Sequence, residues 1–449
     1  MSLAMRNLAL MLALSLGVTL LGFAAARKPG ARPPNFIVIL ADDFGYGDLG
    51  CCGSREIATP HLDRMAAEGV RFTDFHVTAS ICSPSRASLL TGCYAQRAGM
   101  PFVLFPTEPK GLPPEEITLA ELLKQCGYTT ACIGKWHLGF LPPFRPARQG
   151  FDYFFGLPYS NDSAKQPADK RFDPVLAPAE LPLMRGDEIL EAPVNQETLT
   201  ERYTEEAIRF IRQNQSRPFF LYLPHTFPHR PLYASGRFRG KSRGGLYGDT
   251  VECLDWSAGQ ILYTLKELGL DDRTLVLFTS DNGAPPASKR PEEGGGSNGP
   301  LRGWKFTAYE GGFRVPAIFR WPGKIPAGRV CQELATTMDL FPTFAKLAGA
   351  KPPRDRMMDG KDIWPLLTQP GAHSPHVFFG PLPRLPVAGR AQRALETFPG
   401  TARLSDADDH HVHGPRGSDS KTLPSAQPAQ SLRFGKRLGG NSRSGCGSS

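Results

Sequence analysis

The pattern of hydrophobic positions predicts a parallel β-sheet that is covered on both faces. Continuous apolar runs of strand length occur at four places along the chain: 36–40, 129–133, 218–223 and 274–279. Strands buried on both faces have such runs instead of a strict alternation of apolar and polar residues. Helices are predicted between them, because Thr118 and Glu121 form a capping box before a stretch that stops at Gly127, and 248–268 has the length of a long helix. These elements together predict an α/β fold.

Acidic and amide side chains follow two of the predicted strands. Asp42 and Asp43 come after the first run, and Asp281 and Asn282 come after the last. In open α/β sheets, ligands bind beyond the carboxyl ends of the strands. An all-oxygen set suits Ca²⁺, with Mg²⁺ as the other hard candidate. Taken alone, each pair is also typical of a solvated turn or a hairpin.

A cysteine precedes a predicted helix in the stretch Cys82-Ser-Pro84-Ser-Arg86, which is followed by Thr91 and Gly92. Pro84 suits the first helical position, and this places Cys82 at or near the N-cap. Free backbone N–H groups and the helix dipole favour an anion there, and the guanidinium of Arg86 offers paired N–H donors that match a tetrahedral oxyanion. The stretch therefore predicts a sulfate or phosphate pocket. The alternative is a buried structural thiol ahead of an ordinary capped helix.

The same letters, Cys-x-Pro-Ser-Arg followed by Thr-Gly, resemble the signature of the sulfatase family. The similarity extends from about Asn35 to about Gly380, and the local sequence most resembles arylsulfatase A and N-acetylgalactosamine-6-sulfatase. The resemblance implies an alkaline-phosphatase-like fold, with a mixed, mostly parallel sheet between helices and a smaller C-terminal subdomain. It also implies that a formylglycine-generating or equivalent maturation enzyme oxidises Cys82 to Cα-formylglycine. The implied reaction is hydrolysis of a sulfate ester with a divalent cation, bound by Cys82 after conversion together with the oxygen ligands.

Two further motifs carry the resemblance. Gly134-Lys135-Trp136-His137 resembles the family motif with a sulfate-binding lysine and a histidine near the formylglycine. Lys305, before Phe-Thr-Ala-Tyr-Glu-Gly-Gly, resembles the second sulfate-binding lysine. Without the resemblance, an exposed lysine and an ordinary loop histidine are the default interpretations of these positions.

Two loops complete the predicted site. The stretch Pro-His-Thr-Phe-Pro-His-Arg-Pro contains His225 and His229, and His229 fits the spacing of the family's active-site histidine better, with His225 as the second choice. Ser160 falls where arylsulfatase A has a site serine. The resemblance implies that His229 or Lys305 protonates the departing alcohol, and that His137 is the base that allows sulfate to leave.

Length, charge and cysteine content restrict the predicted domain organisation and the classes of partner. A chain of 449 residues with 41% hydrophobic residues is long enough for one large domain, predicted at 33–375, and a small one. The net charge is +9, but residues 381–449 hold ten Lys or Arg against five Asp or Glu and so supply +5 of it. The remainder is near neutral and has no basic stripe, which argues against nucleic-acid binding. Nine cysteines do not form a disulfide scaffold, and no pairing is predicted.

The N-terminal segment 1–26 predicts a cleavable secretory signal. It contains Arg6, an apolar run at 8–23 and three alanines at 24–26. An uncleaved membrane anchor is the alternative, although the run is short for a bilayer span, which needs about 20 residues. We therefore expect a secreted, periplasmic or lysosomal protein with no stable membrane span after cleavage.

The C-terminal segment 376–449 has few large apolar residues and no sustained period, which predicts disorder from 381 onward. Since the resemblance stops near Gly380, we interpret this segment as the remnant of a truncated or frameshifted subdomain. Three substrate classes remain open: a sulfated small molecule, a glycolipid or a polysaccharide. Two other functions also remain open: a phosphonate monoester or phosphodiester hydrolase of the same superfamily, and an inactive glycan-binding relative.

Overall fold

The computed structural model describes residues 32–106, 108–163 and 180–377. All of them belong to one compact unit, Met1–Leu382. The predicted signal peptide at 1–26 and the predicted tail at 381–449 lie outside the described residues. Within the described residues, no helix combines the length and the apolar character needed to cross a membrane.

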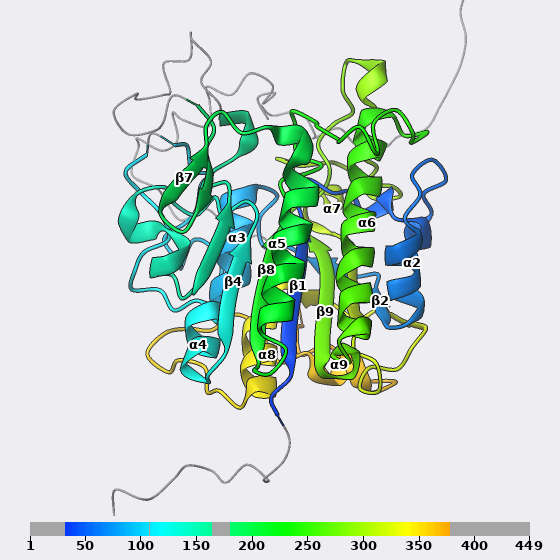
Figure 1. Ribbon diagram of the computed structural model, residues 1–449. Helices are drawn as coiled ribbons and strands as arrows, with labels where there is room; N and C mark the ends of the chain where they lie inside the picture. The colour runs from blue at the N-terminus through cyan, green and yellow to red at the C-terminus, as the bar shows by residue number, and fades with distance from the viewer. Residues whose placement is uncertain (1–31, 107, 164–179, 378–449) are drawn as a thin grey trace, which may run out of the picture. The chain divides into compact units, whose positions relative to one another are not determined.

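A ten-stranded mixed sheet forms the centre of the unit (Figure 1). Its middle five strands are parallel: β9 (Thr274–Ser280), β1 (Asn35–Ala41), β8 (Phe219–Pro224), β4 (Thr129–Ile133) and β5 (Tyr153–Gly156). On one side, β10 (Ala317–Arg320) pairs antiparallel with β9 and with β2 (Val70–Phe72), and β11 (Arg329–Cys331) pairs in parallel with β2. On the other side, β6 (Leu183–Arg185) pairs antiparallel with β5 and with β7 (Glu188–Glu191). A separate two-stranded sheet pairs β3 (Phe75–His76) with β12 (Ala335–Thr336). All four predicted strands are confirmed in the parallel centre.

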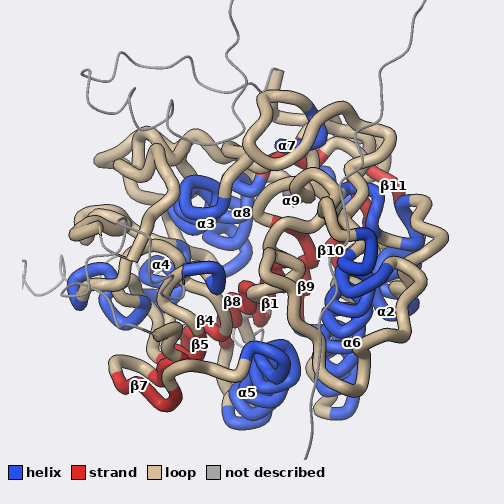
Figure 2. Tube along the Cα trace, turned by 90° about the horizontal axis from the view of Figure 1, so that it is seen from above, coloured by secondary structure: helices blue, strands red, loops and turns tan. Residues whose placement is uncertain are grey.

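Helices cover both faces of the sheet, because alternate side chains of each buried strand point to opposite faces. Along β1, Phe36 and Val38 pack in one hydrophobic cluster, and Ile37 and Ile39 pack in another. The first cluster includes residues of α3 (Cys82–Thr91), α4 (Leu119–Gln125), α8 (Leu340–Ala348) and α9 (Trp364–Thr368). The second includes residues of α2 (Pro60–Ala67), α5 (Leu199–Gln213) and α6 (Gly245–Glu267). Figure 2 shows α5 and α6 on one side of the strands and α3 and α4 on the other.

The helix termini test the capping predictions. The capping box of α4 is confirmed, since Thr118 Oγ1 accepts a hydrogen bond from the Glu121 amide at 3.1 Å and Glu121 Oε2 accepts one from the Thr118 amide at 2.7 Å. In α3, however, Ile81 is the N-cap and Cys82 is the first helical residue. Pro84 is therefore third in the helix instead of first. Proline is tolerated there because the first four N–H groups of a helix have no partner within it.

Candidate active site

Two acidic turns meet at the carboxyl ends of β1 and β9. These strands pair in parallel up to Ala41 opposite Ser280, so the residues that follow each strand are neighbours. The amide of Asp43 donates to Asp281 Oδ1 at 3.2 Å, and Asn282 Nδ2 donates to Asp43 Oδ1 at 2.7 Å. All four side chains, including Asp42, are buried. The two predicted oxygen pairs therefore form one cluster.

Helix α3 begins beside this cluster and brings two more predicted residues to it. Cys82 Sγ lies 3.5 Å from Asp42 Oδ1. One turn later, Arg86 Nη2 lies 2.8 Å from Asp281 Oδ2 and 3.2 Å from Asp42 Oδ2. Arg86 Nη1 also donates to the carbonyl of Lys135 at 2.7 Å. The buried guanidinium thus links the start of the helix to both acidic turns.

Two lysines approach the cluster from other loops. Lys135, which follows β4, donates from Nζ to Asp42 Oδ2 at 2.5 Å and to Ser160 Oγ at 3.0 Å. Lys305 Nζ lies 2.8 Å from Asp43 Oδ1. Burial lowers the pKa of Lys305, but the nearby acidic groups, with Asp43 first among them and Asp42 also contributing, together outweigh burial and raise this pKa above its usual value. Cationic side chains therefore surround the acidic cluster, and Ser160 positions one of them.

His229 faces the cluster from the loop after β8. Its Nε2 atom lies 3.7 Å from Asp43 Oδ2, and its Nδ1 atom is 3.0 Å from Asn161 Oδ1. Because the amide oxygen of Asn161 can only accept, Nδ1 carries the proton and Nε2 points to the carboxylates. Burial, Lys305 and Lys135 lower the pKa of His229. By contrast, His225 Nε2 lies 3.3 Å from Ser257 Oγ of α6, so the geometry favours His229 over His225.

His137 lies on the loop after β4 with its ring buried. Its Nε2 atom donates to the carbonyl of Leu104 at 2.9 Å, which leaves Nδ1 as the acceptor of the neutral ring. This Nδ1 atom is buried and has no hydrogen-bond partner among the described residues. Burial lowers the pKa of His137 well below its usual value, and the nearby charges of Lys135 and Arg86 lower it further. The ring is therefore a neutral proton acceptor.

The structure adds Asn161 to the residues predicted from sequence. Its Nδ2 atom donates to Gln196 Oε1 and to the carbonyl of Pro231, both at 3.1 Å, which fixes Oδ1 toward His229. Its position directly after Ser160 is the signal that the sequence offers for it. Asn161 is a positioning residue, because it contacts His229 and not the acidic cluster itself.

The donor set fits a divalent cation. One ligand atom from each of Asp42, Asp43, Cys82 and His229 lies within 4.8 Å of the others. Asn282 Oδ1 is buried and has no hydrogen-bond partner among the described residues, so this oxygen is available as a cation ligand. Burial raises the pKa of Asp42, but Lys135 and other nearby positive groups hold it well below its usual value, so this carboxylate is ionised. By contrast, burial and the negative charge of Asp42 raise the pKa of Asp281 to about 7. A set of carboxylate and amide oxygens suits a hard cation.

Comparisons with known proteins identify the family of the chain. The profile of the sulfatase family matches residues 34–350. Steryl-sulfatase of Mus musculus is 40% identical over an alignment 441 residues long, and the match covers 83% of this chain and 71% of that protein. N-acetylgalactosamine-6-sulfatase of Rattus norvegicus is 45% identical over an alignment 368 residues long, and the match covers 78% of this chain and 68% of that protein.

Solved structures share the fold. The PsFucS1 sulfatase from Pseudoalteromonas sp. aligns with a TM-score of 0.69 and 32% identity, covering 76% of this chain and 73% of its own. A phosphonate monoester hydrolase of Agrobacterium radiobacter, at 21% identity, aligns with a TM-score of 0.56 over 81% of this chain and 83% of its own, and it shows the fold alone. The predicted alkaline-phosphatase-like fold is confirmed. The chain belongs to the sulfatase family of sulfuric ester hydrolases.

Proposed function

We propose that the protein hydrolyses sulfate esters at Cys82 after conversion of this residue to Cα-formylglycine. The observation that carries the proposal is the position of Cys82 at the start of α3, with its Sγ atom 3.5 Å from Asp42 and cationic side chains around the same carboxylates. Hydration of the aldehyde supplies two hydroxyls on one carbon, so that a sulfated side chain has a route to release sulfate that a serine lacks.

The acidic cluster is proposed to hold the cation. Asp42, Asp43, Asp281 and Asn282 would bind it, with Ca²⁺ as the first candidate and Mg²⁺ as the second. A bound cation supplies positive charge that polarises the reacting oxygen. Lys135 and Lys305 contact carboxylates of the acidic cluster in this structure. A cation bound to these carboxylates would replace the lysines as their partner, so that both ammonium groups would be available to bind a sulfate ester.

The cationic side chains have a common task in the proposed reaction. Arg86, Lys135 and Lys305 neutralise the charge of the bound ester and the charge that develops as the ester bond breaks. Ser160 holds the ammonium of Lys135 through its hydroxyl. Because these groups are buried and held beside the site by the fold, they need little reorganisation of water during the reaction.

Two proton transfers are assigned to the remaining residues. The departing alcohol needs a proton, which the ammonium of Lys305 or a protonated His229 donates. The raised pKa of Lys305 keeps its ammonium charged, whereas the lowered pKa of His229 restricts its protonated form to acidic solution. His137 presents Nδ1 as the base that takes a proton while sulfate leaves.

Initial rates on paired substrates test this function. We expect a higher kcat/KM on 4-nitrophenyl sulfate than on bis(4-nitrophenyl) phosphate with Ca²⁺ present. Cys82→Ser is the control variant, and it should fold and bind the sulfate ester but lose multiple turnover. A preference for the phosphate diester would favour the phosphonate monoester or phosphodiester hydrolase. Absence of turnover on every ester by protein with converted Cys82 would favour an inactive glycan-binding relative.

The substrate class and the location are proposed from the relatives and from the N-terminal sequence. Relatives named steryl-sulfatase and N-acetylgalactosamine-6-sulfatase support a sulfated lipid or glycan as the substrate. The basic, apolar and small residues of 1–26 support export, and Cys82 is the residue that a formylglycine-generating or equivalent enzyme would convert. Edman sequencing of the protein secreted by its host would test export, since a start near residue 27 is expected.

A further inference from the structure

Backbone strain marks a residue that the proposed reaction does not use. Among the described residues, three that are not glycine have φ in the left-handed region: Asp43 at 68°, His137 at 59° and Phe306 at 72°. A strained residue persists only where the surrounding structure holds it in place, and such residues cluster at functional sites. Asp43 and His137 already belong to the proposed site. The third, Phe306, has had no function assigned.

The ring of Phe306 lies beside the proposed sulfate pocket. Lys305 Nζ is 5.1 Å from the centre of this ring and 2.8 Å from Asp43 Oδ1. The backbone amide of Phe306 donates to the carbonyl of Ser80 at 3.0 Å, two residues before Cys82. The strained turn is therefore tied to the loop that leads to Cys82. Phe306 nevertheless has 64% of its surface exposed, so the ring is open to a ligand.

Two other exposed aromatic side chains lie on the same loop, and the ring of one of them, Tyr309, contacts the guanidinium of Arg302 at 3.9 Å. Trp304 is 47% exposed, and Tyr309 is 45% exposed. Exposed aromatic side chains on a loop that carries a site residue are typical of ligand-binding surfaces, since each offers a large rigid apolar face. The strain, the contact with Lys305 and the exposure of the ring together indicate a binding role for Phe306.

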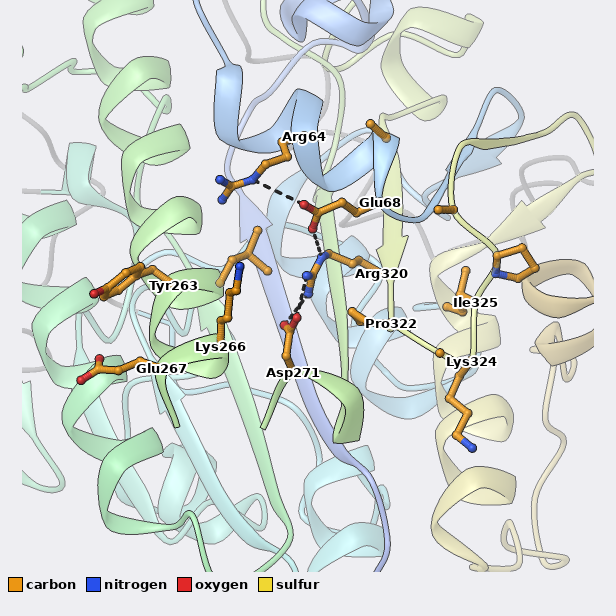
Figure 3. A pocket seen from close by; sticks show the side chains of 15 residues that line it. Arg64, Glu68, Tyr263, Lys266, Glu267, Asp271, Arg320, Pro322, Lys324 and Ile325 are labelled. Atoms are coloured by element: carbon orange, nitrogen blue, oxygen red, sulfur yellow. Dashed lines mark hydrogen bonds and ion pairs between the residues drawn. The ribbon is translucent and has the colours of Figure 1, made fainter. Parts of the chain in front are cut away.

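Tyr263 of α6 is a control position for Phe306, because it is an exposed aromatic residue at the opposite end of the sheet from the acidic cluster. It lines a cavity of about 950 Å³ between α2, α6 and the loop after β10 (Figure 3). Asp271, which also lines the cavity, precedes β9, whereas Asp281 follows it, so the cavity lies at the opposite end of the strand from the acidic cluster. Arg320 in this cavity is paired with Asp271 and Glu68.

We propose that Phe306 is a specificity-determining residue, and that its ring stacks on the cyclic alcohol that carries the sulfate. The inference rests on the proposed sulfatase function and adds the substrate class: sulfate esters of ring alcohols, aryl or sugar, over those of linear alcohols. The sulfate held by Lys305 is joined through one oxygen to the alcohol, so the first ring of the alcohol lies within reach of the Phe306 ring. A flexible chain offers no flat face for this contact.

The test compares two esters with equal carbon number and primary alcohols, cyclohexylmethyl sulfate and heptyl sulfate. The Phe306→Gly variant should raise KM for the ring ester by about threefold to tenfold with little change in kcat, since stacking acts equally on bound substrate and transition state. KM for the linear ester should change less than twofold by the same reasoning. The thermal midpoint should not fall, because glycine adopts positive φ without strain. Phe306→Tyr should keep the ring preference, and Tyr263→Ala should change neither ester.

The possible results distinguish a failure of the inference about Phe306 from a failure of the proposed sulfatase function. If Phe306→Gly raises both KM values equally or lowers kcat on both esters, the ring supports Lys305 and not the substrate, and the inference is overturned. Hydrolysis of both esters by the wild type with no ring preference would also overturn it while leaving the sulfatase function intact. If protein with converted Cys82 hydrolyses neither these esters nor 4-nitrophenyl sulfate, the proposed function itself fails.

Discussion

Replacement of Arg86 by methionine is expected to destabilise the protein strongly. The Arg86 side chain is completely buried, and its guanidinium lies 2.8 Å from Asp281 and 3.2 Å from Asp42. Arg86→Met keeps an apolar stem of similar length but removes the charge between these two carboxylates. Asp42 keeps its ion pair with Lys135, but Asp281 loses the ion pair with Arg86. Removing one partner of a buried ion pair costs about 3–5 kcal/mol, because the remaining charge stays buried without that partner. This is a large part of the roughly 5–15 kcal/mol by which a folded domain is stable.

Equilibrium unfolding in urea, followed by circular dichroism in the presence of a chelator, measures this loss. The matched control is Arg97→Met, because Arg97 pairs with Asp359 at 3.0 Å but is 42% exposed. An exposed pair contributes about 0–1 kcal/mol, so this control should unfold nearly as the wild type does. Added Ca²⁺ should restore part of the stability of Arg86→Met, since a cation among the carboxylates replaces the missing charge. If Arg86→Met lies within about 1 kcal/mol of the wild type in chelator, the predicted dependence of the acidic cluster on Arg86 is wrong.

Two further predictions concern the cation and pH. Asp42→Ala and Asp281→Ala should each abolish Ca²⁺ binding in calorimetry and abolish activity, and full activity of metal-free wild-type protein in excess chelator would contradict this. Burial lowers the pKa of His225 from 6.5 to about 3, so the unfolded chain binds a proton below pH 6.5 that the native state does not. Stability is therefore lost as the pH falls, by about 2 kcal/mol between pH 7 and pH 5 from this group alone. His225→Gln should lose about 2 kcal/mol less than the wild type over that interval, and equal losses would refute the assignment.

The parallel centre of the fold was predictable because burial on both faces leaves a continuous apolar run. The run at 129–133 coincides with β4, and the run at 274–279 lies within β9. The short outer strands, such as β6 and β10, and helix α5 have no counterpart among the predicted elements. Short outer strands depend on partners that are distant in the chain, so local sequence specifies them weakly.

The site was predictable where chemistry follows directly from a strand end or a helix start. Asp42 and Asp281 met as expected because parallel strands end at the same edge of the sheet. Asn161 and Phe306 were not found from sequence, because their importance depends on the path of loops that bring them to His229 and Lys305. The roles of all these residues in the reaction stay predictions.

The dependence of activity on the chemical state of Cys82 tests the central claim most directly. Mass spectrometry of the peptide that contains Cys82 gives the fraction of chains that carry the aldehyde in preparations with different degrees of conversion. Release of inorganic sulfate from 4-nitrophenyl sulfate is then counted for the same preparations. We expect multiple turnovers in proportion to the converted fraction and none from chains with the intact thiol. Sustained turnover by protein in which Cys82 is entirely a thiol would contradict the account.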